Sequence, residues 1–361
     1  MTPLEQEIRR IIALDGPMTI SEYMRTCLGH PKYGYYVTRD PLGPLGDFTT
    51  APEVSQMFGE LLGAWAAAVW RQMGSPARLN LVELGPGRGT LMADALRAAK
   101  ALPAFRAALA VHLVETSDVL AEKQRETLAS SGLPVIWHRD VREIPESPTI
   151  FLANEFFDAL PIHQAIRGEQ GWHERVVALG QDNRLAFAVN PVSAMHFEKA
   201  LPDAVRDAPV GAIYEWRSSA YALEIIHHIK SHGGAALIID YGYAETRLGE
   251  TLQGVRRHGY ADPLSDPGEV DLTAHVDFGA LAQAGRASGM SVNGPLTQGE
   301  FLHRLGIAQR ATRLKANATP QQATDIDSAL ARLTAPGQMG ELFKVLAIAD
   351  PKLGAMPGFD S

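Results

Sequence analysis

A glycine-rich turn between a strand and a helix is the feature that most constrains the fold of this chain. The apolar run 79–84 predicts a strand, and the letters ELGPGRGT over 83–90 lead directly into a helix near 90–100. Glycines at such a turn let a ligand approach the backbone beside the N-terminus of the helix. Further strand candidates alternate with helices near 118–129 and 217–231, which predicts an α/β fold with a parallel sheet. These strands are expected at 110–114, 135–138, 149–153 and 235–240, with a late strand at 342–348.

Composition and charge exclude several classes of protein. The net charge of −8 argues against a nucleic-acid-binding surface, because neutralising phosphates requires clustered Lys and Arg. The single cysteine, Cys27, excludes an internal disulfide and a cysteine-based zinc site, and the scattered histidines predict no metal site. The sequence contains no apolar run of transmembrane length, and its polar, acid-containing start is unlike a signal or transit peptide. We therefore expect a cytoplasmic protein without a membrane span.

The spacing of the glycines indicates the kind of ligand. The dinucleotide fingerprint is G-x-G-x-x-G, whereas Gly85, Gly87 and Gly89 place the third glycine one residue early, and Glu83 precedes the first by two. This E-x-G-x-G-x-G pattern resembles the first motif of class I S-adenosylmethionine-dependent methyltransferases. A carboxylate at Glu83 suits the positive amino group of that cofactor better than it suits a pyrophosphate. The alternative is that the glycines serve only the packing of helix on strand.

Two acids follow the next two strands. Glu115 ends the second strand, where an acid can accept both hydroxyls of a ribose. Enzymes that use NAD share this device, so Glu115 indicates a nucleoside without identifying it; a solvated acid at a helix start is the alternative. Asp140 ends the third strand, where an acid commonly receives the adenine amino group in such methyltransferases, and a surface turn is the alternative.

The fourth strand ends in a polar cluster of Asn154, Glu155 and Asp158. Ligands in open α/β sheets bind beyond the carboxyl ends of the strands. Carboxylates there would offset the repulsion between a protonated guanidinium and a sulfonium, and would hold the planar group by paired hydrogen bonds. We therefore predict that Glu155 and Asp158 hold an arginine side chain as methyl acceptor. The alternative is a capping residue that begins a helix.

A helix is predicted over about 51–73, where apolar residues recur at helical spacing. Thr50 and Glu53 form a capping-box pattern, and Pro52 lies in the first turn, where proline is tolerated.

With these residues in place, the chain resembles the MidA family, the mitochondrial complex I assembly-factor methyltransferases and their bacterial relatives. The matching blocks are long and lie in the family's order over most of the chain. They are HPKYGYY at 30–36, GDFTTAPEVSQMFGE at 46–60, LVELGPGRGTLMAD at 81–94, NEFFDALP at 154–161, IIDYGY at 238–243 and DLTAHVDF at 271–278.

The resemblance implies a Rossmann-like class I methyltransferase core with a mostly parallel seven-stranded sheet, S-adenosyl-L-methionine as cofactor, and symmetric dimethylation of a protein arginine. It implies a respiratory complex I (NADH dehydrogenase) subunit as partner, in the mitochondrial matrix for the eukaryotic relatives. It also places Thr50, Pro52, Glu53 and Asn154 at the cofactor. The block with His275 is similar to the Thr-His-Trp loop of classical arginine methyltransferases. There His275 would pair with an acceptor-site carboxylate or take a proton, and helix capping is the alternative.

We expect four regions. They are an N-terminal helical or lid segment at 1–75, a core at 76–161 and 217–245 with 342–350, an inserted β-meander at 162–216, and a substrate-side insertion at 246–341. Two other functions remain open at this point. One is an NAD-dependent oxidoreductase, which the glycine spacing and Glu83 disfavour. The other is a non-catalytic assembly chaperone on a methyltransferase fold, which the intact glycine turn and Glu115 disfavour. The sequence does not give the oligomeric state.

Overall fold

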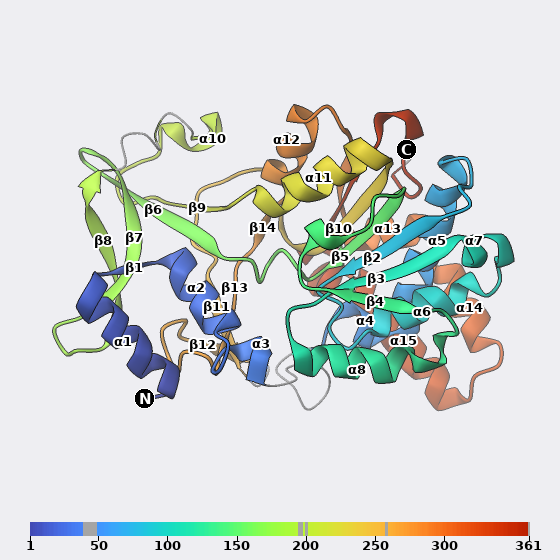
Figure 1. Cartoon of the computed structure of the whole chain (residues 1–361), viewed down its shortest axis with the longest axis horizontal. Coiled ribbons are helices and arrows are strands. Elements are labelled where there is room, and N and C mark those ends of the chain that lie inside the picture. The colour runs from blue at the N-terminus through green and yellow to red at the C-terminus, as the bar shows by residue number, and fades with distance from the viewer. Residues whose placement is uncertain (39–48, 194–197, 199–200, 257–258, 360–361) are drawn as a thin grey trace. The chain divides into compact units, whose positions relative to one another are not determined.

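The computed structural model describes residues 1–38, 49–193, 198, 201–256 and 259–359 (Figure 1). The chain divides into two compact units, which are described separately. The larger unit comprises Thr49–Phe157, Ser219–Ala244 and Phe278–Ser361, and the smaller comprises Met1–Phe48, Asp158–Ser218 and Glu245–Asp277. This division differs from the expected regions because 49–75 and 278–341 pack into the apolar core of the larger unit.

The larger unit is built on a sheet that follows the predicted alternation. Its strands are ordered β15-β16-β10-β5-β2-β3-β4. Neighbours from β10 to β4 run parallel, whereas β16 lies between β10 and β15 and is antiparallel to both. The mostly parallel seven-stranded path confirms the predicted fold class. The strands are β2 (Leu79–Leu84), β3 (Leu109–Val114), β4 (Val135–His138), β5 (Thr149–Asn154), β10 (Gly234–Tyr243), β15 (Ser291–Thr297) and β16 (Phe343–Ala349).

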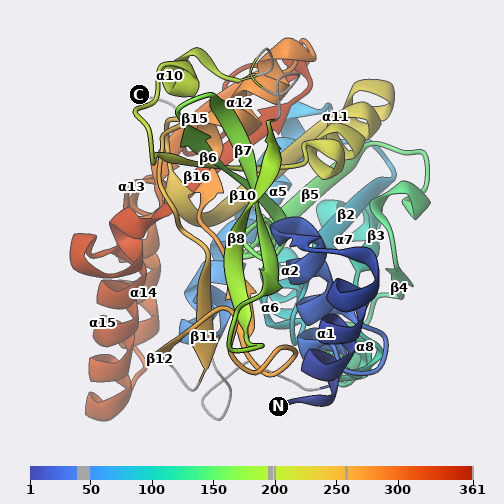
Figure 2. The same cartoon turned by 90° about the vertical axis from the view of Figure 1, so that its left-hand side faces the viewer.

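Helices cover this sheet, and their buried faces carry the predicted apolar periodicity. All residues of β2 and β5 are buried, as expected for central parallel strands covered on both faces. Figure 2 shows α14 and α15 side by side, and the two helices pack on one another. The helices are α4 (Ala51–Val54), α5 (Gln56–Gln72), α6 (Thr90–Ala99), α7 (Pro103–Ala108), α8 (Asp118–Leu128), α11 (Ala220–His232), α12 (Phe278–Ala287), α13 (Gln298–Arg304), α14 (Ile307–Lys315) and α15 (Pro320–Thr334).

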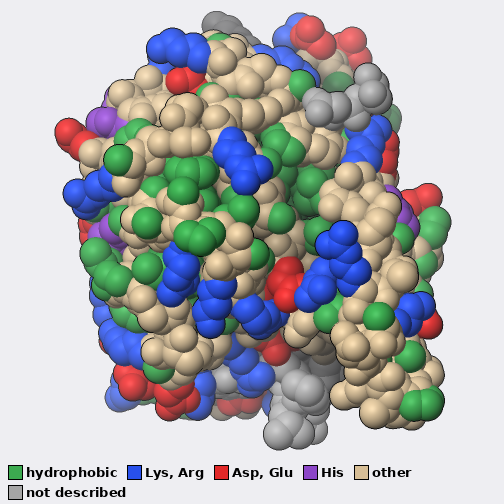
Figure 3. All heavy atoms as spheres, turned by 90° about the vertical axis from the view of Figure 1, so that its right-hand side faces the viewer, with side chains coloured by type: hydrophobic (Ala, Val, Ile, Leu, Met, Phe, Trp, Pro, Cys, Tyr) green, Lys and Arg blue, Asp and Glu red, His purple; other side chains and the backbone are tan. Residues whose placement is uncertain are grey.

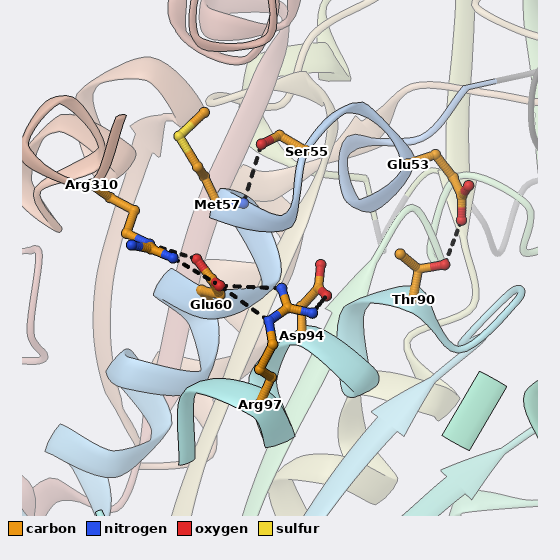
Figure 4. A network of polar contacts seen from close by, with 8 residues as sticks. All are labelled: Glu53, Ser55, Met57, Glu60, Thr90, Asp94, Arg97 and Arg310. Carbon is orange, nitrogen blue, oxygen red and sulfur yellow. Dashed lines mark hydrogen bonds and ion pairs between the residues drawn. The ribbon is translucent and has the colours of Figure 1, made fainter. Parts of the chain in front are cut away.

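The helix predicted over 51–73 is present as α4 and α5, but it is interrupted at Ser55, so the prediction of one continuous helix was wrong. Ser55 is extended, with φ −163° and ψ 139°, and separates α4 from α5, whose start it caps by accepting a hydrogen bond from the Met57 N–H at 3.2 Å. The predicted capping box is also wrong, because the Thr50 side chain makes no capping bond. Glu53 instead accepts a hydrogen bond from the Thr90 hydroxyl at 2.6 Å (Figure 4). A partner distant in sequence has replaced the local one.

Helices α5 and α6 pack in close contact because α5 carries two glycines at their interface. A Cβ at Gly59 would lie 2.6 Å from Asp94 Cβ, and one at Gly63 would lie 2.7 Å from Ala95 Cα. Beside this contact, Glu60 of α5 accepts hydrogen bonds from Arg97 of α6 and Arg310 of α14, which ties the three helices together (Figure 4).

On the face in Figure 3, Lys and Arg side chains lie interspersed with Asp and Glu.

The smaller unit contains the predicted β-meander, formed by β6, β7 and β8 as successive antiparallel neighbours, with β1 beside β7 and β9 beside β6. A second sheet has the order β12-β11-β13. Helices α1 and α2 pack their apolar faces against both sheets. The elements are α1 (Pro3–Asp15), β1 (Met18–Thr19), α2 (Ile20–Gly29), α3 (Tyr35–Thr38), β6 (Ile162–Gly168), β7 (Gly171–Leu179), β8 (Leu185–Ser193), α10 (Asp203–Arg206), β9 (Ile213–Arg217), β11 (Gln253–Arg256), β12 (Gly259–Ala261), β13 (Asp271–Thr273) and β14 (Val276–Asp277).

Among the described residues, no helix is both long and apolar enough to cross a membrane.

Candidate active site

Three strands of the larger unit end in register, and this brings the predicted site residues to one edge of the sheet. Leu84 of β2 pairs with Val114 of β3 and with Ala153 of β5. The residues that follow these three are therefore neighbours: Gly85, Glu115 and Asn154. The Gly85 N–H donates to the Val114 carbonyl at 3.1 Å, which fixes the start of the glycine turn against β3.

The glycine turn uses conformations that other residues adopt only with strain. Gly85, Gly87 and Gly89 have φ values of +59°, +54° and +81°. Left-handed backbone costs a residue with a Cβ about 1–2 kcal/mol. A Cβ at Gly85 would also lie 2.9 Å from the Phe156 ring. Gly89 precedes α6 without any side-chain cap, so the N-terminal N–H groups of a ten-residue helix face this turn.

Glu83 lies beneath the turn and is only 3% exposed. Burial raises the pKa of its carboxyl well above the usual range, and a hydrogen bond from the Met92 backbone in α6 partly opposes this rise. Among the described residues its Oε2 atom has no hydrogen-bond partner. A buried acceptor left unpaired costs about 1–3 kcal/mol. A cationic ligand group would remove that cost, so the residue fits the predicted contact with an ammonium, which stays a prediction.

Glu115 is held by a donor on each carboxylate oxygen. Oε1 accepts from the Ser117 N–H at 2.7 Å, and Oε2 accepts from Gln124 Nε2 at 3.0 Å. Burial raises the pKa of Glu115, and these two hydrogen bonds oppose the rise because they stabilise the charged form. The carboxylate is therefore fixed in orientation beside the turn, as a group that binds ribose hydroxyls must be.

Asp140 begins the short 3-10 helix Val141–Glu143 and accepts from the Arg142 N–H at 2.9 Å. The Arg142 guanidinium also donates a hydrogen bond to each carboxylate oxygen, at 2.8 and 2.7 Å. These hydrogen bonds are the main reason that the pKa of Asp140 falls to about 2. The structure therefore shows Asp140 in a turn near the surface, as the alternative interpretation expected. A role toward adenine stays a prediction.

Asn154 and Glu155 stand at the end of β5. Asn154 is 8% exposed, and its Oδ1 atom has no partner among the described residues. Glu155 has φ +50°, in the left-handed region that favours glycine. Non-glycine residues held in such a conformation cluster at functional sites. Glu155 Oε1 accepts from the Ala51 N–H at 3.1 Å and from Asn154 Nδ2 at 3.3 Å. The carboxylate therefore caps the first turn of α4.

Helix α4 carries the predicted lid residues, and two carboxylates hold it. Glu155 binds its first residue, and Glu53, within α4, reaches the hydroxyl of Thr90 at the start of α6. Thr50 is the N-cap of α4, and Pro52 is buried in its first turn. The structure thus brings α4 together with the glycine turn and the end of β5. Residues 46–48, which begin the matching block 46–60, lie outside the described residues.

Asp158 and His275 belong to the smaller unit, where their main chains lie together. The Asp158 carbonyl accepts from the Ala274 N–H at 3.1 Å and from Arg217 Nη2 at 3.0 Å. Arg217 Nη1 also donates to the His275 carbonyl at 2.6 Å, so one guanidinium joins the two segments. Beside them Tyr36 has a raised pKa, because burial and then the carboxylates of Asp271 and Asp158 disfavour its ionised form.

Sequence reasoning missed Arg217 and Gln124. Arg217 had no local signal, because its partners are carbonyl groups far away in the sequence. Gln124 had one: it lies between Leu120 and Leu128 at steps of four residues, on the apolar face of α8. A polar residue at such a position is buried and needs a polar partner.

A parallel sheet with an antiparallel strand inserted near one edge, a glycine turn after its first strand and a fixed acid after the second defines a Rossmann-like methyltransferase core. The sequence pattern of a family described as putative S-adenosyl-L-methionine-dependent methyltransferase matches residues 61–296 of this chain. The chain belongs to this family. This membership confirms the predicted resemblance and the enzyme class, methyl transfer dependent on S-adenosylmethionine.

Similar proteins cover nearly the whole chain. It is 37% identical to the human protein named protein arginine methyltransferase NDUFAF7, mitochondrial, over 96% of this chain and 83% of that protein. It is 36% identical to the Drosophila melanogaster homolog, over 98% of this chain and 86% of that protein. The crystal structure of a Burkholderia thailandensis protein bound to S-adenosyl-homocysteine superposes with a TM-score of 0.86 at 30% identity, covering 99% of this chain and 94% of that one.

Proposed function

We propose that this chain is a protein arginine N-methyltransferase that uses S-adenosyl-L-methionine. The observation that carries the proposal is its 36–38% identity, over 92–98% of its length, to relatives from several animals that are named protein arginine methyltransferases. The structural relative bound to S-adenosyl-homocysteine, the product form of the cofactor, supports the choice of cofactor.

We assign the cofactor to the edge of the sheet where β2, β3 and β5 end. When bound, the cofactor supplies a methyl group on a positively charged sulfur. The glycine turn gives it close approach to backbone N–H groups, and Glu115 accepts hydrogen bonds from the ribose hydroxyls. The buried atoms Glu83 Oε2 and Asn154 Oδ1 are acceptors of the kind that an ammonium group requires.

Two further parts of the chain complete the proposed cofactor site. Asp140, which stays ionised because its pKa is about 2, would accept the adenine amino group. Thr50, at the N-cap of α4, and Pro52 and Glu53, within α4, would cover the cofactor. Glu53 already accepts a hydrogen bond from Thr90, the first residue after the glycine turn.

The acceptor arginine is assigned to Glu155 and Asp158. A guanidinium stays protonated, so it must lose its repulsion from the sulfonium before it approaches. A carboxylate has about four acceptor sites, so Glu155 has the capacity to hold a guanidinium while Oε1 caps α4. Ion pairing on one side of the guanidinium leaves the opposite nitrogen more nucleophilic. After methyl transfer that nitrogen carries one proton too many, and we assign the proton to His275.

As substrate we propose a subunit of a respiratory NADH dehydrogenase, with symmetric dimethylation as the product, in the cytoplasm of a bacterial cell. The mitochondrial relatives support a respiratory setting, and the family resemblance over six sequence blocks supports the same target.

The test is methyl transfer from tritiated S-adenosylmethionine to NADH dehydrogenase purified from a strain of the source organism that lacks this gene. We expect label on a single subunit, and mass spectrometry should find symmetric dimethylarginine at the labelled position. Gly85→Val protein is the control without a functional cofactor site. Label on a residue other than arginine would overturn the proposed acceptor. Absence of label from a chain that still binds S-adenosyl-homocysteine would overturn the proposed substrate.

A further inference from the structure

Gln124 of α8 is a fully buried amide whose side chain makes three hydrogen bonds around the glycine turn. Its Nε2 donates to the Gly87 carbonyl at 2.8 Å and to Glu115 Oε2 at 3.0 Å. Its Oε1 accepts from the Trp137 indole N–H at 2.8 Å. Burying an amide without partners costs about 2–7 kcal/mol, so a glutamine is tolerated here only because its partners are supplied.

The orientation of this amide is determined by the chemistry of Trp137. An indole N–H is a donor only, so it must face the oxygen of the amide. The NH2 group then faces the two acceptors, Gly87 and Glu115. Reversing the amide would set NH2 against the indole N–H and the amide oxygen against a carboxylate. Trp137 thereby fixes the direction in which Gln124 donates.

The turn also packs directly on the same residue. A Cβ added at Gly89 would lie 3.5 Å from Cα and Cγ of Gln124. Gln124 is therefore in contact with the second half of the glycine turn, holds a carbonyl in its middle and binds the acid beyond β3. The Ser117 N–H donates to the other oxygen of Glu115 and the Thr116 backbone also donates to this carboxylate, so three donors hold it. Its remaining acceptor directions are set before any ligand arrives.

We propose that Gln124 is a positioning residue that couples the glycine turn to Glu115, so that recognition of the ribose hydroxyls depends on the Trp137–Gln124 pair. The inference rests on the proposed cofactor site, in which Glu115 binds the ribose. The inference adds a requirement that cannot be read from the glycine motif or from Glu115 alone. A side chain from α8 must hold these two parts of the site, which follow different strands, at a fixed spacing.

The test compares two ligands in isothermal calorimetry of the full chain: S-adenosyl-homocysteine and its analogue without the two ribose hydroxyls. In Gln124→Met the carboxylate and the turn each lose a hydrogen bond, one of them to a charged group. We expect the Kd for S-adenosyl-homocysteine to rise about 10- to 100-fold, which corresponds to roughly 1.4–3 kcal/mol. The Kd for the analogue should change less, so the preference for the hydroxylated ligand shrinks. A purely structural role would weaken both ligands equally and leave that preference unchanged.

Two further variants keep the test decisive if Gln124→Met is poorly folded. Trp137→Phe retains Gln124 but removes the donor that orients it, and should reduce the ribose preference partially. Gln124→Asn keeps the amide but shortens the side chain by one methylene, so the amide cannot reach Gly87, Glu115 and Trp137 together, and the variant should reduce the preference further. Gln321→Met, at an exposed glutamine of α15 that bonds Asp325, is the matched control and should behave as wild type.

The outcomes separate this inference from the proposed function. A wild-type chain that binds neither ligand overturns both the cofactor site and the role of Gln124. A wild-type chain that prefers the hydroxylated ligand, together with Gln124 variants that keep the same preference, leaves the cofactor site intact and overturns the positioning role.

Discussion

Replacing Glu155 with glycine should separate its role at the acceptor site from its role in the fold. At φ +50° the glutamate pays a left-handed backbone cost of about 1–2 kcal/mol that glycine does not pay. Against this gain, the variant loses the hydrogen bond to the Ala51 N–H, an N-terminal capping interaction worth about 1 kcal/mol. It also gains unfolded-state freedom, which costs roughly 0.5–1 kcal/mol. The free energy of unfolding should therefore stay within about 1 kcal/mol of wild type.

Methyl transfer should respond differently. If the Glu155 carboxylate holds the acceptor guanidinium, its removal should lower the turnover rate by about 100-fold or more, as loss of a preorganised electrostatic contact does elsewhere. Urea unfolding would measure the stability, calorimetry with S-adenosyl-homocysteine would confirm an intact cofactor site, and the tritium assay would give the rate. Glu155→Gln, which keeps an oxygen for Ala51 but no charge, should show the same loss of turnover.

Ser75→Gly is the matched control, because Ser75 also has a positive φ, +55°, but lies at an exposed turn of the same unit. It should be no less stable than wild type and fully active. Normal turnover by Glu155→Gly would remove Glu155 from the acceptor site. A loss of more than about 3 kcal/mol of stability would refute the balance of strain and capping worked out above.

Three other perturbations test separate parts of the structure. Gly85→Val should abolish the thermal stabilisation that S-adenosyl-homocysteine gives to the wild type, because the added side chain meets the Phe156 ring, and a retained shift in melting temperature would contradict the assignment of the turn. Burial, together with the neighbouring His138, lowers the pKa of His112 from 6.5 to about 4. Between pH 6.5 and pH 4 the native state therefore binds fewer protons than the unfolded chain, so the free energy of unfolding falls as the pH falls. From about pH 7 to pH 5 this residue should account for a loss of about 2 kcal/mol in urea unfolding, and a His112→Asn variant with an equally steep loss would show that the acid sensitivity arises elsewhere. Thr90→Val removes the hydroxyl that Glu53 accepts from, and should increase amide hydrogen exchange in α4 while α5 is unaffected; unchanged exchange in α4 would mean that this bond does not hold the helix.

The strands of the core were predictable because burial on both faces makes them continuous apolar runs. The bounds predicted for β2 and β4 match the structure at both ends, and the positions of Gly85 and Glu115 follow from those strands. Strand β15 was missed, since it lies at the edge of the sheet, is half-exposed along its length, and contains the sequence Asn293-Gly294-Pro295, which reads as a turn.

The polar contacts of the site were predictable in position but not in partner. Local spacing paired Glu53 with Thr50, whereas the fold offered Thr90, and no periodicity reveals a contact between residues 37 positions apart. For the same reason the sequence assigned Glu155 to a ligand but did not show that it caps α4. Gln124 could have been recognised from the sequence, because it lies on the apolar face of α8. A buried amide needs hydrogen-bond partners, although the sequence does not show which residues they are.

Helix α4 has only four residues, too few to be stable as an isolated helix, since nucleating the first turn is unfavourable. Its helical state therefore depends on contacts supplied from outside, and the Ala51 N–H donates to the carboxylate that we assign to the substrate arginine. A substrate arginine that binds the Glu155 carboxylate shares its negative charge with the Ala51 N–H, and so weakens the hydrogen bond from Ala51. The Ala51 amide is therefore a spectroscopic probe of the acceptor site. Its proton chemical shift in NMR spectra should change when a substrate arginine binds, before any methyl transfer takes place.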